Sequence, residues 1–309
     1  MKFLKPKFWE NKTNILAILL IPFSILFYFI INLRKYFISP KKFNIPVICV
    51  GNIYVGGTGK TPLSIEIAND LKLKKRNPVI IKKYYKSHKD EQMLINEITD
   101  SVILNKNRPQ AIEEAERKNF DIAILDDGFQ DYAIEKNFNI ICFNSNQLIG
   151  NGLIFPAGPL RESFSSLKRA QIVIINGEKN KMFEEKILQI SKRIKIFYSK
   201  YVPVNLDQFK NKKLFAFAGI GNPENFFKLI SENNLNIKKK KIFPDHFDLA
   251  ADDIKKMIDV AKKNDFELIT TEKDFYRIKD YGFNEIKYLK VDLIIEEKNK
   301  FINEIISHL

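Results

Sequence analysis

The chain opens with an uncharged and strongly apolar stretch. Residues 13–33 contain no charged side chain and are mostly Ile, Leu and Phe. About 18 or more such residues are enough to cross a bilayer, so we expect an N-terminal membrane-associated helix within residues 1–38. Lysines flank the stretch on both sides, so the positive-inside rule does not predict which end of the helix faces the cytoplasm. The sequence is compatible with a helix that spans the bilayer and with one that lies in a single leaflet. The alternative is a buried core helix, which would need a large core around it.

Beyond this stretch, short apolar runs alternate with amphipathic segments. The runs are typical of buried parallel strands, and the segments have the spacing of helices with one apolar face. This alternation predicts an α/β fold with a mostly parallel sheet and helices on both of its faces. The expected strands are 45–50, 78–81, 120–125, 138–143 and 170–175, and the expected helices are 63–71, 111–118 and 184–194.

A second, shorter series of the same kind follows towards the C-terminus. Residues 196–204, which include Pro203, indicate an extended connector between the two series. We therefore expect a first α/β domain over residues 39–204 and a smaller C-terminal α/β domain over residues 205–309. The expected strands of the second domain are 213–218 and 266–270, and its expected helices are 224–232 and 254–263.

The composition narrows the class of protein. Hydrophobic residues make up 45% of the 309 residues, which excludes a disordered chain. The two cysteines and three histidines exclude a disulfide framework, a four-cysteine zinc site and a histidine-rich metal centre. The net charge of +14, which comes from 43 Lys and 8 Arg against 37 acidic residues, favours anionic partners such as a nucleotide or a membrane surface. Because the lysines are spread along the chain, we do not expect nucleic acid among these partners.

A glycine-rich loop lies between the first expected strand and the first expected helix. Its sequence, GNIYVGGTGKTP at 51–62, has Tyr54 where the P-loop pattern has its first glycine, but GGTGKT is retained. The amides of such a loop and the N-terminus of the following helix bind phosphate oxygens; a chance glycine-rich turn is the alternative. We expect Lys60 on the β/γ-phosphates and Thr61 on Mg²⁺, and the nucleotide-binding residues are Gly56, Gly57, Thr58, Gly59, Lys60 and Thr61.

An acidic pair follows another expected strand. Asp126 and Asp127 open the motif DDGFQ directly after the apolar run 120–125. In P-loop proteins a carboxylate in this position holds the Mg²⁺ that bridges the phosphates. We assign Asp126 to the metal, beside Thr61, and Asp127 to catalysis, beside Lys60. The alternative is an acidic turn without a chemical role.

Six motifs, in their order along the chain, resemble those of the tetraacyldisaccharide 4'-kinase (lipid A 4'-kinase) family. They are GNIYVGGTGKTP, DDGFQ, FPAGPLRES (155–163), FAGIGNPENFF (217–227), FPDHFD (243–248) and TTEKD (270–274). The resemblance covers nearly the whole chain, including the apolar N-terminus. It implies a P-loop kinase fold, ATP and Mg²⁺ as cofactors, and phosphorylation of the 4'-hydroxyl of a tetraacylated glucosamine disaccharide 1-phosphate in lipid A biosynthesis. It also implies a peripheral or monotopic enzyme on the cytoplasmic face of the inner membrane.

The resemblance also assigns roles on the acceptor side. His246, within FPDHFD, is the best candidate for the base that takes the proton of the sugar hydroxyl, because an imidazole with a pKa of about 6.5 suits neutral pH. A structural histidine in a loop is the alternative. Arg161 and Glu162 are expected to bind phosphate or sugar, and the pair Asn107-Arg108 is also assigned to the substrate. Lys60, Thr61 and Mg²⁺ carry the donor side, because phosphoryl transfer depends mostly on positioning and charge stabilisation.

The chain departs from the family pattern at several positions. Asn107 replaces the Asp that works with the catalytic His in the family, and an amide cannot accept a proton as a carboxylate does. Either another carboxylate supports His246, or this enzyme is slow, altered in substrate or inactive; we expect activity because Lys60, both aspartates and His246 are retained. The other departures are Lys82-Lys83-Tyr84-Tyr85 in place of Ser-Arg-Gly-Tyr, Lys89-Asp90-Glu91-Gln92 in place of Gly-Asp-Glu-Pro, and Asp131 in place of His.

The alternative function is that of a membrane-bound P-loop ATPase or switch protein that lacks lipid kinase activity. Such a protein would use the nucleotide without a lipid acceptor. Phosphate transfer to lipid, as opposed to hydrolysis of ATP alone, separates the two functions.

Overall fold

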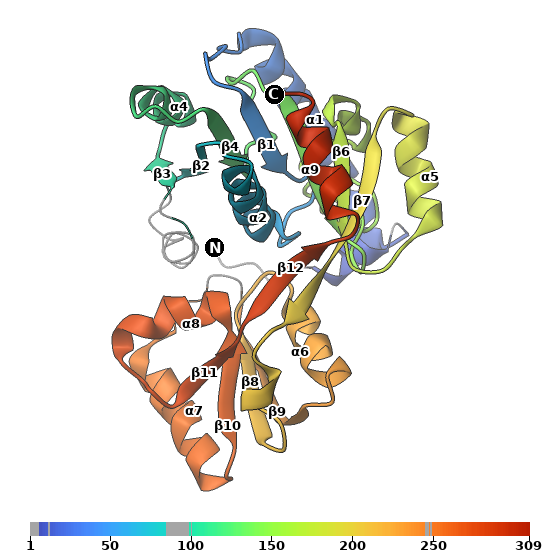
Figure 1. Cartoon of the computed structure of the whole chain (residues 1–309). Helices are drawn as coiled ribbons and strands as arrows, with labels where there is room; N and C mark the ends of the chain where they lie inside the picture. Colours follow the sequence, from blue (N-terminus) through green and yellow to red (C-terminus); the bar gives the residue numbers. More distant parts are fainter. Residues whose placement is uncertain (1–5, 12, 85–98, 100, 245–246, 248) are drawn as a thin grey trace. The chain divides into compact units, whose positions relative to one another are not determined.

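The structure is a computed structural model of the chain and describes residues 6–11, 13–84, 99, 101–244, 247 and 249–309 (Figure 1). Contacts divide these residues into two units. The P-loop unit holds the described residues of 5–84, 99–200 and 293–309, and the second unit holds those of 201–292. The expected domain boundaries after residues 38 and 204 stay predictions.

An eight-stranded sheet forms the centre of the P-loop unit. Its strand order is β12-β7-β6-β5-β1-β4-β2-β3, and the pairings from β7 to β3 are parallel. Helices α4 and α5 pack on one face, while α2 and α9 lie on the other (Figure 1). The strands are β1 (Val47–Gly51), β2 (Pro78–Lys83), β3 (Val102–Asn105), β4 (Ile122–Asp126), β5 (Phe138–Asn144), β6 (Ile172–Asn176), β7 (Lys195–Pro203) and β12 (Val291–Ile295). The helices are α2 (Lys60–Leu73), α4 (Arg108–Arg117), α5 (Lys181–Ile190) and α9 (Lys298–Ile306), with short 3-10 helices η1 (Lys7–Glu10) and η2 (Phe164–Arg169).

The predicted α/β class, with a mostly parallel sheet between helices, is confirmed. Residues 196–204 were expected to form an extended connector, and most of them form strand β7, which leads from the P-loop unit into the second unit. Residues 195–199 of β7 pair in parallel with β6. Phe197 is buried and contacts Phe301 of α9, with ring centroids 5.3 Å apart. The first part of this segment is therefore a packed strand of the P-loop sheet, which the sequence did not indicate.

The second unit is built on a smaller parallel sheet, with strand order β11-β10-β8-β9. Helix α6 packs on one face of this sheet, and α7 packs on the other. The strands are β8 (Lys213–Ala218), β9 (Asn236–Ile242), β10 (Glu267–Thr271) and β11 (Ile286–Leu289). The helices are α6 (Pro223–Glu232), α7 (Ala251–Lys263) and α8 (Glu272–Ile278), with 3-10 helices η3 (Leu206–Gln208) and η4 (Lys279–Tyr281).

Helix α1 (Ile15–Phe37) is the apolar helix expected at the N-terminus. Its 18-residue window has a mean hydropathy of 2.5, and only 11% of that window is buried. A narrow stripe contacts the P-loop unit: Ser24 Oγ donates to the carbonyl of Ile154 at 2.8 Å and accepts from the amide of Ala157 at 2.9 Å. Most other apolar side chains of the helix, such as Leu19 and Phe29, are exposed. The helix is therefore held at one stripe and is not a buried core helix.

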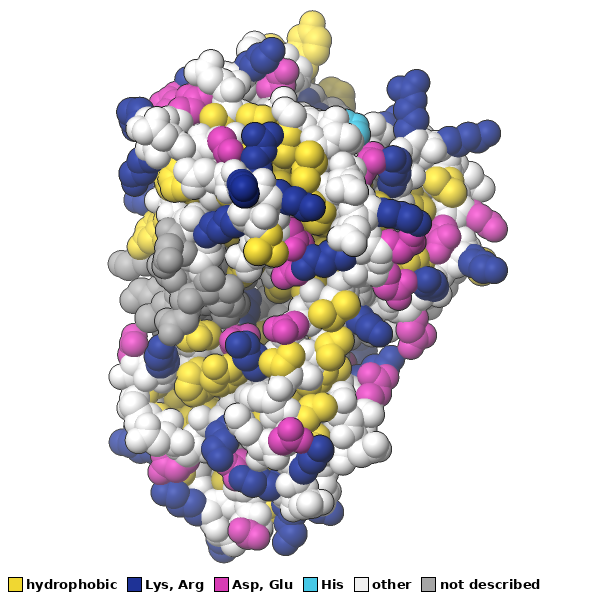
Figure 2. Space-filling view, viewed as in Figure 1, with side chains coloured by type: hydrophobic (Ala, Val, Ile, Leu, Met, Phe, Trp, Pro, Cys, Tyr) yellow, Lys and Arg dark blue, Asp and Glu magenta, His cyan; other side chains and the backbone are white. Residues whose placement is uncertain are grey.

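The visible surface carries both signs of charge. Figure 2 shows Lys and Arg side chains distributed over that face and interspersed with Asp and Glu. The positive charge on this face is thus not gathered into a single patch.

Candidate functional site

The glycine-rich loop leads from β1 directly into α2. Gly59 is the residue before the helix and has φ of 88°, a conformation that favours glycine. Gly51, at the end of β1, has no room for a side chain, because a Cβ there would lie 2.5 Å from Cβ of Phe129. Within the loop, the Asn52 side-chain amide donates to the carbonyl of Gly56 at 3.2 Å and to Thr58 Oγ1 at 2.9 Å. These contacts hold the loop in shape and put Lys60 and Thr61 in the first turn of α2.

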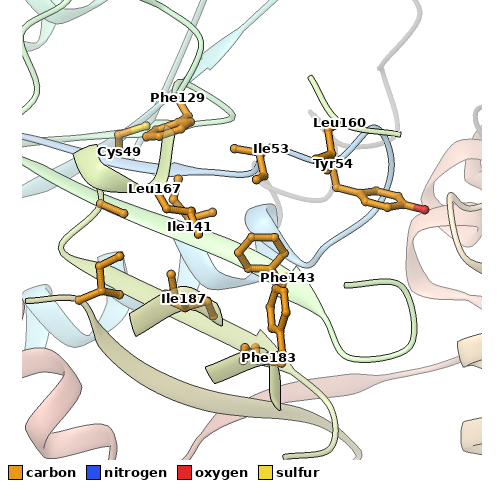
Figure 3. Close-up of a cluster of buried hydrophobic side chains, with 14 of the residues drawn as sticks. Cys49, Ile53, Tyr54, Phe129, Ile141, Phe143, Leu160, Leu167, Phe183 and Ile187 are labelled. Atoms are coloured by element: carbon orange, nitrogen blue, oxygen red, sulfur yellow. The ribbon is translucent and has the colours of Figure 1, made fainter. Parts of the chain in front are cut away.

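The missing first glycine of the P-loop pattern has a structural reason. Tyr54 is buried in the core cluster between the sheet and α5 (Figure 3). The backbone around it pairs with the later motif FPAGPLRES: the amide of Val55 donates to the carbonyl of Pro159 at 2.8 Å, and the amide of Arg161 donates to the carbonyl of Ile53 at 2.7 Å. The first half of the loop is thus a packing element that also brings Arg161 to the site.

Thr61 and Asp126, the two residues predicted as metal ligands, lie together. Thr61 Oγ1 donates to Asp126 Oδ2 at 2.8 Å. Asp126 is the last residue of β4, next to β1 in the sheet, and its side chain is fully buried. The other oxygen, Oδ1, is buried and has no hydrogen-bond partner among the described residues. A buried carboxylate oxygen without a partner, next to a hydroxyl, fits a Mg²⁺ ion that takes one or two protein oxygens and completes its shell with phosphate and water.

Asp127 faces a different pair of groups. Its backbone is left-handed, with φ of 57°, and its carboxylate lies 3.7 Å from Lys60 Nζ. Arg161 Nη1 donates to both carboxylate oxygens, at 2.9 and 3.0 Å. Burial opposes ionisation of Asp127, but the positive charges of Lys60 and Arg161 outweigh it and hold the pKa of this carboxyl well below its usual range. Asp127 is therefore a carboxylate between two cations.

Glu162, predicted to contact substrate, has its carboxylate engaged within the protein. It is 2% exposed, and burial favours its neutral form, but the charges of Arg169 and Lys35 lower its pKa. Arg169 donates to its Oε2 at 2.6 Å, Lys35 of α1 donates to the same oxygen at 3.0 Å, and Gln130 donates to Oε1 at 3.1 Å. Glu162 thus ties the apolar helix to the motif DDGFQ, and substrate contact stays a prediction.

Asn107 and Arg108 lie at the N-terminus of α4. The Asn107 side chain accepts from the amide of Gln110 at 3.3 Å and caps the helix, as an aspartate would. Arg108 is buried and donates to the carbonyls of Asp126 and Asp127, at 3.0 and 2.8 Å. It also pairs with Asp131 at 3.5 Å. Arg108 therefore supports the backbone of the acidic pair, and its contact with substrate stays a prediction.

The remaining predicted residue, His246, lies outside the described residues. Sequence reasoning missed Asn52, which shapes the loop, and Lys82, which contacts Asp126 and Thr61. The position of Asn52 within the motif is a signal that could have identified it. Lys82 could also have been identified, because it follows an apolar run at the carboxyl end of an expected strand.

Comparisons with known proteins agree with one another. The sequence model of a family described as tetraacyldisaccharide-1-P 4'-kinase matches residues 16–309. The tetraacyldisaccharide 4'-kinase of Pelagibacter ubique (strain HTCC1062) is 39% identical over 313 residues, covering 99% of this chain and 98% of the relative. That of Rickettsia canadensis (strain McKiel) is 37% identical over 324 residues, covering 98% and 97%. A crystal structure of the "apo" form of LpxK from Aquifex aeolicus in complex with ATP has the same fold, with a TM-score of 0.71 and 24% identity over 95% of this chain and 99% of that chain.

Proposed function

The chain belongs to the tetraacyldisaccharide-1-P 4'-kinase family, and from this premise we propose that it transfers the γ-phosphoryl group of ATP to the 4'-hydroxyl of a tetraacyldisaccharide 1-phosphate. The observation that carries the proposal is the pair formed by Thr61, in the first turn of α2, and Asp126, the last residue of β4. Thr61 Oγ1 lies 2.8 Å from Asp126 Oδ2, and Lys60 precedes Thr61 in the same turn. This is the arrangement with which P-loop enzymes hold a nucleotide and its metal.

The donor side of the reaction rests on residues of the loop and the acidic pair. The amides of residues 56–61 and the N-terminus of α2 bind phosphate oxygens, and Lys60 neutralises the charge that develops on the transferred group. Thr61 and Asp126 would hold Mg²⁺, which would offset the negative charge of the phosphates and polarise the transferred group. Lys60 Nζ lies 3.7 Å from the Asp127 carboxylate, so we infer that the phosphates of ATP compete with this carboxylate for the lysine.

The acceptor side requires a base. We assign this role to His246, which would take the proton of the sugar hydroxyl as the new P–O bond forms, while the bond from the γ-phosphorus to the β,γ-bridging oxygen breaks and ADP leaves. Arg161, already beside Asp127, is suited to bind a phosphate of either substrate, since its guanidinium offers paired donors. His246→Ala is expected to lower kcat by about 10²-fold or more while the Kd for ATP, measured by calorimetry, is unchanged. An unaltered kcat would sink the assignment.

We further propose that the enzyme is monotopic, with α1 lying in the cytoplasmic leaflet of the inner membrane. The exposed apolar side chains of α1 suit a lipid environment. However, the helix is also bonded to the P-loop unit near its middle, through Ser24, and near its C-terminal end, through Lys35 and Glu162. A spanning orientation would draw the surface of the P-loop unit that is bonded to Ser24 into the hydrocarbon, together with charged neighbours such as Arg161 and Glu162. Charged side chains are costly at that depth.

The test is a transfer assay with the full-length protein in detergent. With γ-³²P-ATP, Mg²⁺ and tetraacyldisaccharide 1-phosphate, we expect label in the lipid fraction, and Lys60→Ala should reduce this transfer by about 10²-fold or more. An exposed lysine on α5, Lys186→Ala, is the matched control and should retain transfer. Release of labelled phosphate with no labelled lipid would overturn the proposal and favour an ATPase.

A further inference from the structure

A lysine fills the space between the two predicted metal ligands. Lys82 lies near the carboxyl end of β2 and pairs in register with Asp126 of β4. Its Nζ is 2.5 Å from Asp126 Oδ2 and 3.3 Å from Thr61 Oγ1. The Lys82 side chain is 7% exposed, and that of Asp126 is fully buried. One ammonium group therefore contacts both side chains to which we assign Mg²⁺.

Lys82 and Asp126 form an ion pair between two neighbouring strands. A buried ammonium needs a partner of opposite charge, since leaving it unpaired is strongly unfavourable. Asp126 is that partner, and the pair is neutral while both are charged. A serine would leave Asp126 with its full negative charge, available to a cation from solution.

The ammonium of Lys82 and a Mg²⁺ ion exclude each other from this position. Mg²⁺ takes oxygen ligands at about 2.0–2.1 Å, so an ion shared by Thr61 and Asp126 Oδ2 would lie where the Lys82 Nζ contacts both. An ion on Oδ1, which has no partner among the described residues, would still lie beside this ammonium. Positive charges so close in a buried site repel each other strongly, so metal binding is favoured only when the ammonium moves away from Asp126.

We propose that Lys82 is a built-in cation that keeps free divalent metal out of the site until a nucleotide is bound. The phosphates of ATP are strong acceptors for an ammonium group. When the nucleotide is bound, a phosphate oxygen can therefore replace Asp126 as the partner of the Lys82 ammonium. The site then exchanges one cation for another, and Mg²⁺ and ATP bind together. Lys82 acts as a positioning residue, because it controls the availability of Asp126. This inference rests on the proposed ATP site and adds that the metal binds tightly there only together with the nucleotide.

The experiment measures metal binding without turnover. Mn²⁺, a spectroscopic substitute for Mg²⁺, is titrated into the nucleotide-free, full-length protein in detergent, and free Mn²⁺ is followed by electron paramagnetic resonance. We expect Lys82→Ser and Lys82→Gln to bind one Mn²⁺ about tenfold or more tightly than the wild type, since a neighbouring positive charge has gone. Adding Asp126→Asn to either variant should abolish the gain. Lys83→Gln, the next residue of the same strand, is the matched control and should behave as the wild type.

The outcomes of the Mn²⁺ titration test the role of Lys82 independently of the kinase function. Tight binding of Mn²⁺ to the nucleotide-free wild type would overturn it, whatever the variants do. So would an unchanged Mn²⁺ affinity in a Lys82 variant with a native circular dichroism spectrum. With ATP present, the difference in Mn²⁺ affinity between wild type and variants should shrink. Failure of the kinase function would show instead as a lack of labelled lipid in the wild type.

Discussion

At the scale of single residues, two neighbouring aspartates have opposite surroundings. Asp126 is buried and contacts Thr61 and Lys82, whereas Asp127 turns towards Lys60 and Arg161. The motif predicted an acidic site beside the P-loop, and the structure places it there. The different partners of the two carboxylates depend on the left-handed backbone of Asp127 and on a lysine 44 residues away. Neither is visible in the local pattern, because both depend on which strands become neighbours.

The lowered pKa of Asp127 predicts a dependence of stability on pH. A carboxyl group whose pKa is lower in the folded than in the unfolded state stabilises the fold above its unfolded pKa, about 3.9, and this contribution is lost as the pH falls towards the folded pKa. We expect the difference in Tm between wild type and Asp127→Asn to shrink when the pH is lowered from 6 to 3. Thermal unfolding across this range measures it, with Asp259→Asn on the exposed side of α7 as control. A difference that stays constant with pH would contradict the role given to Lys60 and Arg161.

Asn107 gives a second prediction at this scale. Aspartate and asparagine cap helices about equally well, so Asn107→Asp should fold as the wild type does. If Asn107 stands in place of a lost partner of the base, the new carboxylate should raise kcat in the lipid transfer assay. Asn107→Ala, which loses the cap and about 1 kcal/mol of stability, should give no such gain. An active Asn107→Asp enzyme without higher kcat would indicate that another group supports His246.

At the scale of elements, strands that consist of apolar runs were predicted well, whereas a strand of mostly polar residues was missed. Strands β1, β2, β4, β5 and β6 were expected close to where they lie, because each is buried and consists mostly of apolar residues. Strand β9 was missed because its sequence, NIKKKKI, is mostly exposed. It forms an edge of its sheet, where lysines discourage pairing with another chain. Burial, more than strand propensity, decided which strands the sequence predicted.

The attachment of α1 also belongs to this scale. Glu162 bonds Lys35 of the helix and Arg169 of η2, so Glu162→Gln should weaken the hold on the C-terminal end of α1 and cost about 1–3 kcal/mol. We expect a lower Tm and several-fold faster trypsin cleavage at Lys41 and Lys42, which follow the helix. Sedimentation with membranes should be retained, since the apolar side chains are unchanged.

The control for this prediction is Glu185→Gln on the exposed side of α5, which should leave the Tm and the trypsin cleavage rate as in the wild type. A Glu162→Gln protein with wild-type Tm and cleavage rate would show that Glu162 does not hold the helix, and would return it to consideration as a substrate contact.

At the scale of the whole molecule, the proposed membrane association depends on both the net charge and the apolar helix. A net charge of +14 should attract the protein to anionic lipid, and at 1 M salt this attraction is screened beyond a Debye length of about 3 Å. We expect 1 M NaCl to reduce binding to phosphatidylglycerol vesicles, as measured by flotation, without abolishing it. A variant lacking residues 1–38 should lose its remaining binding at that salt concentration. Complete release of the full-length protein by salt would contradict insertion of α1.

The place of β12 and α9 in the fold was not visible in the sequence patterns. The two series of strands and helices were expected, but β12 and α9 were not assigned to the first of them. Their contacts are with parts of the chain far away in sequence: α9 packs beside β7 through Phe301 and reaches α2 through Lys298, which pairs with Asp70 at 2.9 Å. Such contacts follow from the fold as a whole, and the local pattern contains no signal for them.

Helix α9 belongs to the P-loop unit although it follows the second unit in the sequence, and this has a consequence for how the protein is made. Phe301 and Ile305 of α9 are fully buried within the P-loop unit, although the second unit is translated between them and the rest of that unit. On the ribosome, the nucleotide-binding sheet must therefore wait, with one edge uncovered, until β12 and α9 have been made. A nascent chain in this state exposes apolar surface and a strand edge that favour aggregation, and a stop codon before α9 would damage the part of the protein that was made first.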